Sequence, residues 1–348
     1  MTHHYTYSIL PLDADHLQRF ETFARAVHSH DGVPAFSEQT VIELAKASTS
    51  SEGSSAAPRV YLHAALSEAN SDSEILAALV EILPTESDPG LLEAAVAPAA
   101  RGEHLGHEFF EQVLSLLHAP VERYTLWVHG SATDTGIISP ADSLVREYSF
   151  APVRTLFKML LPLDSDTRES LTEAADARSL PEGLSARTFE LENYQRADGP
   201  AWIEANAAAF AHHPEQGKLV LEDLVQRVES EWFRPEGFFI AEDSNSDAPS
   251  MAAYVWTKIP TAQEKGEYSP AGEIYVVGVH PNAQGGGLGR TLTLKALAYL
   301  ALAQDERGRD LRAIELYVDE DNTPALKLYE SLGFRVHTID RMYAPVQP

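Results

Sequence analysis

The sequence contains no cysteine, which removes several classes of chemistry at once. A chain without thiols forms no disulfide, offers no thiolate to a metal ion and cannot use a cysteine nucleophile. No uninterrupted apolar run reaches the roughly 20 residues needed to cross a bilayer. The opening residues, MTHHYTYSILPLDAD, do not combine a basic segment with an apolar core, so we expect no secretory signal and a cytoplasmic protein.

Basic residues are scarce: 26 Lys and Arg stand against 52 Asp and Glu, for a formal net charge of −26. Such a chain repels nucleic acid and anionic membrane surfaces, and neither is expected as a partner. It also repels an anionic ligand at long range, so such a ligand would have to be held by hydrogen-bond donors and basic side chains within its binding site. The 348 residues, 44% of them hydrophobic, are enough for two domains of ordinary size.

The stretch from Glu273 to Gly289, EIYVVGVHPNAQGGGLG, predicts a strand, a short turn, a glycine-rich loop and the start of a helix. Backbone N–H groups at a helix entrance have no partner within the helix, and together with the helix dipole they form an anion site suited to a pyrophosphate. The loop matches neither a Walker motif nor a dinucleotide-binding fingerprint. An ordinary strand–helix connection is the alternative, although three consecutive glycines are costly in conformational entropy.

A second helix is predicted over Thr323–Leu332, with Asn322 as its N-cap and Gly333 just past its end. Helical spacing places Tyr329 on the apolar face of this helix. Tyr329 is then either a core tyrosine or a buried phenol that could serve as a general acid. Glu273, which opens the apolar strand, is either a surface residue at a strand end or a candidate general base.

The first half of the chain repeats the order of the second half. Val96-Ala-Pro98 aligns with Val279-His-Pro281, which sets His104 opposite Gly287, and Gly90 falls opposite Glu273. Val145 likewise stands opposite Tyr329, so the first copy lacks both candidate reactive groups. We predict two tandem α+β domains, each a mixed sheet flanked by helices: residues 1–163, non-catalytic, and residues 185–348, catalytic, joined by a linker over 164–184.

The segments HPNAQGGGLG and DNTPALKLYESLGF, in this order and at domain-sized spacing, resemble the acetyl-CoA-binding and closing motifs of the GNAT family of N-acetyltransferases. Other strings match a tandem branch of that family: DGVPAFSEQ (31–39), NAAAFAHHPEQG (206–217), VWTKI (255–259) and VHTIDRMYA (336–344). The resemblance implies an acetyl-CoA-dependent enzyme that acetylates the cysteinyl amine of cysteinyl-glucosaminyl-inositol. It would require a small-molecule partner and no metal, and we expect a monomer. The alternatives are an acetyltransferase for a peptide N-terminus, a polyamine or an antibiotic, or a non-catalytic acyl-CoA-binding regulator.

The resemblance gives Glu273 and Tyr329 the catalytic roles. Acetyl transfer to an amine requires loss of the ammonium proton, a polarised thioester carbonyl and an acid for the departing thiolate. We expect direct attack over the strand 274–279, because the chain has no cysteine and no serine in a nucleophile-elbow motif.

The resemblance also implies two sets of acetyl-CoA contacts. Those of the second copy are Val277, Gly278, Val279, Gln284, Gly285, Gly286, Gly287, Leu288, Gly289, Arg290, Asn322, Thr323, Pro324, Ala325, Leu326 and Lys327. Those of the first copy are Ala94, Ala95, Val96, Gly102, Glu103, His104, Leu105, Gly106 and His107. His104 stands where the backbone should approach phosphate and Glu103 adds repulsion, so we expect weak or no binding in the first copy.

The substrate-binding residues implied by the resemblance are Glu38, Glu215, Lys258, Glu273 and Tyr317. Each also has an ordinary structural interpretation. Glu38 could favour a helix dipole, Glu215 could be solvated, Lys258 could be exposed at a strand end, and Tyr317 could belong to the core. The pair His212-His213 has no third ligand at useful spacing, so no metal site is expected there.

Overall fold

The computed structural model describes residues 5–50, 58–67, 74–102, 104–131, 139–192, 194–195, 197–211, 216–243, 251–261 and 271–346. The chain forms two compact units. Unit 1 comprises Met1–Lys158, Asp319–Asn322 and Val336–Pro348, and unit 2 comprises Met159–Val318 and Thr323–Arg335. Among the described residues, no helix is both long enough and apolar enough to cross a membrane.

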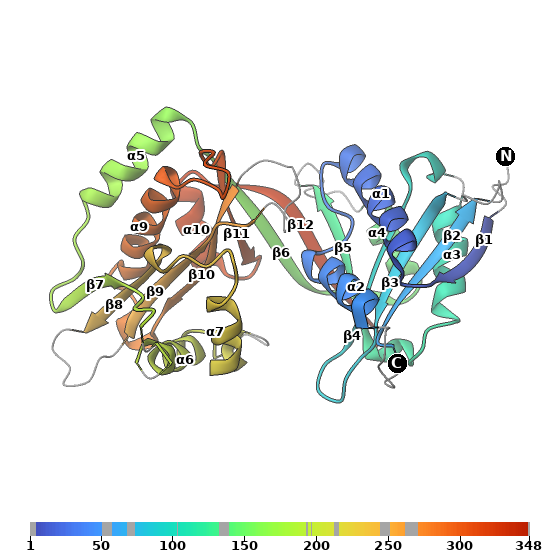
Figure 1. Cartoon of the computed structure of the whole chain (residues 1–348), viewed down its shortest axis with the longest axis horizontal. Coiled ribbons are helices and arrows are strands. Elements are labelled where there is room, and N and C mark those ends of the chain that lie inside the picture. The colour runs from blue at the N-terminus through green and yellow to red at the C-terminus, as the bar shows by residue number, and fades with distance from the viewer. Residues whose placement is uncertain are drawn as a thin grey trace. The chain divides into compact units, whose positions relative to one another are not determined.

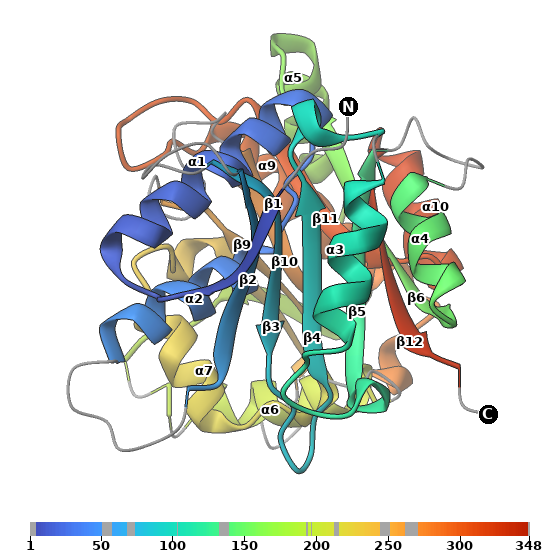
Figure 2. The same ribbon diagram turned by 90° about the vertical axis from the view of Figure 1, so that its right-hand side faces the viewer.

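Unit 1 is a sheet with helices on both faces (Figures 1 and 2). Its strands lie in the order β1-β2-β3-β4-β5-β12, with β4 and β5 parallel and the other neighbouring pairs antiparallel. Figure 2 shows α1 and α2 on one side of this sheet and α3 and α4 on the other. The elements are β1 (Tyr5–Leu10), α1 (Ala14–Asp31), α2 (Glu38–Ser50), β2 (Val60–Ser67), β3 (Ile75–Ile82), β4 (Gly90–Val96), α3 (Leu105–Leu114), β5 (Tyr124–Ser131), α4 (Pro140–Glu147) and β12 (Arg335–Pro345).

Unit 2 has the same layered architecture. Its strands follow the order β11-β10-β9-β8-β7, with β10 parallel to β11 and antiparallel to β9. Figure 1 shows α5 and α9 on one side of these strands and α6 and α7 on the other. The elements are α5 (Ser165–Asp176), β7 (Leu184–Thr188), α6 (Asp198–Ala209), α7 (Leu221–Val228), β8 (Phe238–Asp243), β9 (Met251–Lys258), β10 (Ala271–Val279), α9 (Leu288–Leu302), β11 (Ala313–Asp319) and α10 (Thr323–Ser331). Strand β6 (Phe150–Pro162) begins in unit 1 and ends in unit 2.

Aromatic side chains dominate the core under α6 and α7. Trp202, Tyr254 and Trp256 are fully buried, and the Trp202 ring meets each of the other two at 5.7 Å between ring centroids, edge to face. Each buried aromatic of this size contributes roughly 1.5–3 kcal/mol through burial alone. This cluster holds α6 and α7 against β9 and β10, the strands that carry the site described below.

The structure differs from the expected linker. Residues 165–176 form helix α5, whose N-cap Asp164 accepts a hydrogen bond from the Thr167 backbone N–H at 2.8 Å. Leu171 and Ala175, four residues apart and buried, give the helix an apolar side. The charged composition of this segment hid that short apolar stripe. The division of the chain into domains at this point stays a prediction.

The last strand of the chain, β12, completes the sheet of unit 1 rather than that of unit 2. It pairs antiparallel with β5, with Asp340 opposite His129. Asp142 on α4, only 1% exposed, accepts hydrogen bonds from the hydroxyl of Tyr343 at 2.6 Å and from Arg341 at 3.2 Å. In unit 2, Leu163, just after β6, donates its backbone N–H to the carbonyl of Arg312 beside β11 at 2.9 Å. The last strand of the chain therefore pairs within unit 1, although α10, the helix before it, belongs to unit 2.

A buried ion cluster joins β12 to β5. The ring of His129 lies 2.9 Å from Asp340 Oδ1 and 3.5 Å from Glu93 Oε1. Burial by itself would lower the pKa of His129, but the carboxylates of Asp340 and Glu93 outweigh it and raise the pKa to about 10. His129 is thus an imidazolium at neutral pH, and its charge holds together the buried carboxylate of Glu93 and the partly buried carboxylate of Asp340.

This cluster predicts a pH-dependent contribution to stability. A raised folded-state pKa stabilises the fold fully below the unfolded value of about 6.5, and that stabilisation disappears as pH rises towards the folded pKa. We therefore expect the thermal-unfolding midpoint of the wild type to exceed that of His129→Gln at pH 6, and the two midpoints to converge towards pH 10. The control is His107→Gln, which changes a partly exposed histidine of unit 1. A difference between wild type and His129→Gln that is constant over this range would contradict the assignment.

Candidate active site

The candidate site is built on β10, which pairs differently with its two neighbours. The antiparallel ladder with β9 continues to Val279, with a shift of register between Ile274 and Val276 that makes Tyr275 a bulged residue. The parallel ladder with β11 ends at the pair Ile274–Leu316, although both strands continue. The side of β10 that faces β11 therefore offers backbone groups outside the ladder between residues 275 and 279.

A row of charged side chains crosses the sheet where the two ladders meet. Glu273 pairs with Lys258 on β9 and with Glu315 on β11, so the three side chains share one face. Lys258 is only 8% exposed, and its Nζ lies 5.2 Å from the centre of the Trp232 ring, which follows α7. The interpretation of Lys258 as an exposed strand end is therefore wrong, because Trp232 covers it.

Glycine at position 278 is required by packing. A Cβ atom built there would lie 2.3 Å from the Tyr254 ring, which crosses directly over the strand. The Tyr254 hydroxyl is fixed in turn by a hydrogen bond to Asn206 Oδ1 at 2.7 Å. This contact brings β9 and β10 close together in the segment that has left β11.

The glycine-rich loop leads into α9 with no side-chain cap. Gly285 and Gly287 have φ of +90° and +76°, and Gly287 is the N-cap residue. The first helical hydrogen bond runs from the N–H of Thr291 to the carbonyl of Gly287. The N–H groups of Leu288, Gly289 and Arg290 thus have no acceptor within the helix, which is the geometry of an anion site.

Helix α10 meets the entrance of α9. The guanidinium of Arg290 donates to Ser331 Oγ at 2.6 Å, so the two motifs read from the sequence come together. Gly333, with φ of +96°, ends α10 as predicted. Asn322, Thr323, Pro324 and Lys327 are exposed at the start of α10, and Ala325 and Leu326 are half-buried.

Tyr329 points inward from α10, and it is 7% exposed. Its ring packs edge to face on Phe334 with 5.9 Å between the ring centroids. Burial raises the pKa of Tyr329 to about 12, so the phenol keeps its proton throughout the neutral range. A buried, protonated phenol suits a general acid as well as a core residue.

A cavity of about 660 Å³ lies beside the glycine-rich loop. Gln284, Gly286 and His280 line one side of it, and Ala201 and Glu204 on α6 line the other. Neither Glu273 nor Tyr329 is part of its lining. The cavity therefore adjoins the glycine-rich loop, and it does not enclose the candidate base Glu273 or the candidate acid Tyr329.

The remaining predicted substrate contacts are placed only in part. Tyr317, two residues beyond Glu315 on β11, is 45% exposed, so the core interpretation of it is wrong. Glu38 is the first residue of α2 in unit 1, and its side chain is outside the described part of the structure. Glu215 lies outside the described residues.

The sequence reasoning missed Glu315, which is 3% exposed and in register with Glu273. The alternation in Ile-Glu-Leu-Tyr-Val, residues 314–318, carried the signal: the apolar residues take one face and leave Glu315 and Tyr317 together on the other. An acidic residue that enters a strand in this pattern is a candidate for a site on the less apolar face.

The loop of the first copy has the same backbone conformation as the glycine-rich loop of the second copy, but its side chains differ. Gly102 and His104 have φ of +82° and +63°, matching Gly285 and Gly287, and His104 is the N-cap residue of α3. A side chain in this left-handed conformation costs roughly 1–2 kcal/mol. Glu103 is outside the described residues. Ala94, Ala95 and Val96 end β4, and Leu105, Gly106 and His107 form the first turn of α3.

The alignment of Gly90 with Glu273 is wrong by one residue. Strand β4 pairs with β3 without a register shift, whereas β10 contains the bulge at Tyr275. Five steps along the neighbouring strand lead from the partner of Val96 to the partner of Leu91, and five steps lead from the partner of Val279 to the partner of Glu273. Leu91 therefore stands where Glu273 does, and the first copy still has no carboxylate at that position.

Comparison with protein families and solved structures agrees with this architecture. Residues 201–334 match the model of the acetyltransferase (GNAT) family. A tandem GNAT protein from the clavulanic acid biosynthesis pathway superposes with a TM-score of 0.64 at 16% identity, covering 99% of this chain and 100% of its own. A GCN5-related N-acetyltransferase from Sphaerobacter thermophilus gives 0.61 at 22% identity, covering 97% and 94%. These structures show the fold and confirm the predicted tandem α+β class.

Curated relatives are closer in sequence. Mycothiol acetyltransferase of Rothia mucilaginosa is 57% identical over 332 residues, which cover 95% of this chain and 90% of the relative. Mycothiol acetyltransferase of Thermobifida fusca is 39% identical, with 93% and 92% covered. Similarity of this degree over nearly the whole length includes both halves of the chain. The chain therefore belongs to the mycothiol acetyltransferase family, a tandem branch of the GNAT acetyltransferases.

Proposed function

We propose that this protein transfers an acetyl group from acetyl-CoA to the cysteinyl amine of cysteinyl-glucosaminyl-inositol to give mycothiol, and that unit 2 carries the reaction. The observation that carries the proposal is the 57% identity over 95% of the chain to a mycothiol acetyltransferase. The geometry of unit 2 supports it, because the departure of β10 from β11, the uncapped entrance of α9 and the inward phenol of α10 occur together.

The residues present fit acetyl-CoA. The uncapped N–H groups of Leu288 to Arg290 suit its pyrophosphate, and the exposed glycines at 285–287 let the backbone approach the phosphates closely. The backbone of Val277, Gly278 and Val279 lies where β10 has left β11, and it would hold the pantetheine arm. When bound, acetyl-CoA supplies the acetyl group as a thioester.

Glu273 is the proposed general base. Its carboxylate lies in the row with Lys258 and Glu315 on one face of the sheet. Charged side chains arranged in this way suit a substrate that carries an ammonium group on a polar sugar. Glu273 accepts the proton of the incoming amine, directly or through water. Lys258 and Tyr317 would contact the hydroxyl groups of the substrate. Glu38 and Glu215 stay predicted substrate contacts that rest on the sequence alone.

Tyr329 is the proposed general acid. Because burial raises the pKa of its hydroxyl to about 12, Tyr329 is protonated when the reaction begins and can donate to the departing sulfur. Backbone N–H groups between residues 277 and 279 polarise the carbonyl. The chain thus supplies a base, an acid and a set of amide donors, and with these groups the amine can attack the thioester directly, so no covalent acyl-enzyme is needed.

The first test combines substrate and base. The purified protein with acetyl-CoA and cysteinyl-glucosaminyl-inositol is expected to release CoA and to form an amide visible by mass spectrometry, and Glu273→Gln should lower kcat by about 100-fold or more. Glu315→Gln, which changes the neighbouring carboxylate in the same row, should cost much less. If Glu315→Gln lowered kcat more than Glu273→Gln does, Glu315 would be the better candidate for the general base. Turnover of a peptide or polyamine amine, with none of this substrate, would refute the proposed acceptor.

Tyr329→Phe tests the acid. Phenylalanine keeps the edge-to-face packing on Phe334 and removes only the hydroxyl, so kcat should fall by about 100-fold or more while acetyl-CoA binding and the unfolding midpoint stay near wild type. Tyr299→Phe, on α9 of the same unit, is the matched control. A wild-type kcat in Tyr329→Phe would leave Tyr329 with a packing role alone.

The third prediction concerns the two loops. Calorimetric titration with CoA is expected to give one tight site per chain, because His104 replaces Gly287 in the first copy. Gly287→His should weaken that site about 10-fold or more, since a side chain at this φ is strained and covers the free N–H groups. His104→Gly, the reverse change, should leave the tight site unaltered. Two tight sites in the wild type would show that His104 does not obstruct binding.

A further inference from the structure

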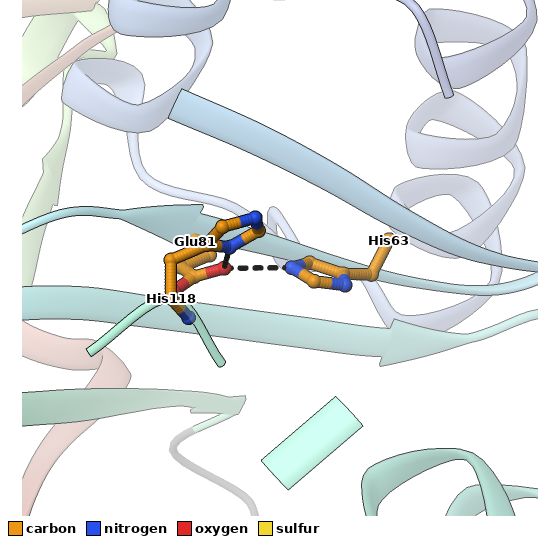
Figure 3. A group of neighbouring side chains, drawn as sticks. All are labelled: His63, Glu81 and His118. Atoms are coloured by element: carbon orange, nitrogen blue, oxygen red, sulfur yellow. Dashed lines mark hydrogen bonds and ion pairs between the residues drawn. The ribbon is translucent and has the colours of Figure 1, made fainter. Parts of the chain in front are cut away.

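Three side chains able to bind a metal ion converge in unit 1, in the unit that lacks the proposed reactive pair. Figure 3 shows His63, Glu81 and His118 with both imidazoles directed at the carboxylate. His63 Nε2 and His118 Nδ1 each lie 2.8 Å from Glu81 Oε2. One donor atom from each residue lies within 4.8 Å of the other two. The side chains of His63 and Glu81 are fully buried, and that of His118 is 31% exposed.

The sheet register explains the convergence. Tyr61 on β2 stands opposite Glu81 on β3, and His63, two residues further along β2, shares that face. His118 follows α3, and its backbone N–H donates to Glu81 Oε1 at 2.9 Å. The His118 ring also stacks on Tyr61 with 3.6 Å between ring centroids and 11° between planes. Backbone and ring contacts thus hold His118 over the carboxylate.

A second layer of groups orients the three residues. The Tyr7 hydroxyl lies 2.8 Å from His63 Nδ1, the nitrogen that faces away from Glu81. The Tyr124 hydroxyl donates to Glu81 Oε1, the oxygen that the imidazoles leave free. Metal-binding histidines are typically oriented through their second nitrogen, and metal-binding carboxylates through further hydrogen bonds. Both features are present here.

The charge of the cluster favours a cation. The Glu81 side chain is fully buried, and its two oxygens are contacted by the rings of His63 and His118 and by the Tyr124 hydroxyl. A buried anion beside two imidazole rings can be neutralised by a proton or by a metal ion.

We propose that His63, Glu81 and His118 form a Zn²⁺ site. Two imidazole nitrogens and one carboxylate oxygen are zinc donors, with the fourth tetrahedral position left to water on the exposed side of His118. Mg²⁺ and Ca²⁺ prefer all-oxygen sites and are excluded by the two imidazoles. Zinc bond lengths of about 2.0–2.2 Å place tetrahedral donors about 3.3 Å apart, so the carboxylate would withdraw by roughly 0.5 Å from each ring.

Zinc binding would also settle the tautomer of His63. The Nε2 lone pair would face the ion, and the proton would sit on Nδ1 and be donated to the Tyr7 hydroxyl. The ion would connect β2, β3 and the segment after α3, and because it binds only the folded arrangement it would stabilise unit 1 by mass action. The site would be structural, since two of its three ligands have no contact with solvent.

The test uses the full-length protein after treatment with a chelator. Titration with Zn²⁺ is expected to show one tight site per chain and a rise in the unfolding midpoint, and Co²⁺ should give the visible absorption of a tetrahedral ion. His118→Asn removes a partly exposed ligand with little change in volume and should abolish the tight site. The control is His107→Asn, which changes a partly exposed histidine in the first turn of α3 and should bind Zn²⁺ as the wild type does.

A second variant separates ligand loss from misfolding. Tyr7→Phe keeps all three ligands and removes only the hydroxyl that orients His63, so it should weaken Zn²⁺ about 10- to 100-fold while the protein stays folded. The adjacent pairs His3-His4 and His212-His213 could also bind zinc, and replacing both pairs by asparagine should leave the tight site intact. A folded wild type without a tight Zn²⁺ site, or unchanged affinity in His118→Asn, would show that the three residues form a hydrogen-bonded cluster only.

Discussion

The separation of β10 from β11 after the pair Ile274–Leu316 is the constraint on which the proposed site depends. A parallel ladder that continued to Val279 would pair the backbone groups that a thioester and its pantetheine arm require. The bulge at Tyr275 accompanies the separation, because the extra residue turns Tyr275 and Val276 towards the aromatic cluster of Trp232 and Trp256. Packing against these rings favours the bulged strand over a continuous ladder. Glu273 lies one residue before Ile274, the last position at which all three strands are in register.

The two copies use one backbone for different purposes. Gly102 and His104 repeat the left-handed conformations of Gly285 and Gly287, so the loop is retained even where a side chain strains it. In unit 1, several polar residues form hydrogen bonds and ion pairs that hold its strands and segments together. His129 is held between Glu93 and Asp340, and Asp142 anchors β12. Glu81 contacts two imidazole rings and accepts hydrogen bonds from the Tyr124 hydroxyl and the His118 backbone N–H. These buried groups determine which strand and which segment can dock, since an unpaired buried charge is costly.

Much of the fold and the family could be predicted from the sequence. The glycine-rich entrance to α9 and the helix from Thr323 to the glycine at 333 are local patterns, and both were found where expected. The tandem α+β class and the GNAT family were confirmed by comparison. The catalytic roles of Glu273 and Tyr329 stay predictions, although the structure places Tyr329 inward and Glu273 in a row with Lys258 and Glu315. The alignment error at Gly90 arose because a bulge inserts one residue without any local signal in composition.

The sequence by itself determined the elements whose causes lie within a few residues: helix caps, glycine turns, alternating strands and the motifs that identify the acetyltransferase family. Only the tertiary structure decided which distant residues share a face or a strand partner. The burial of Lys258 under Trp232, the pairing of β12 with β5, and the meeting of His63, Glu81 and His118 all depend on the packing and register of segments far apart in the chain. Register is set by the packing of whole faces, and a shift of one residue moves every side chain to the opposite side.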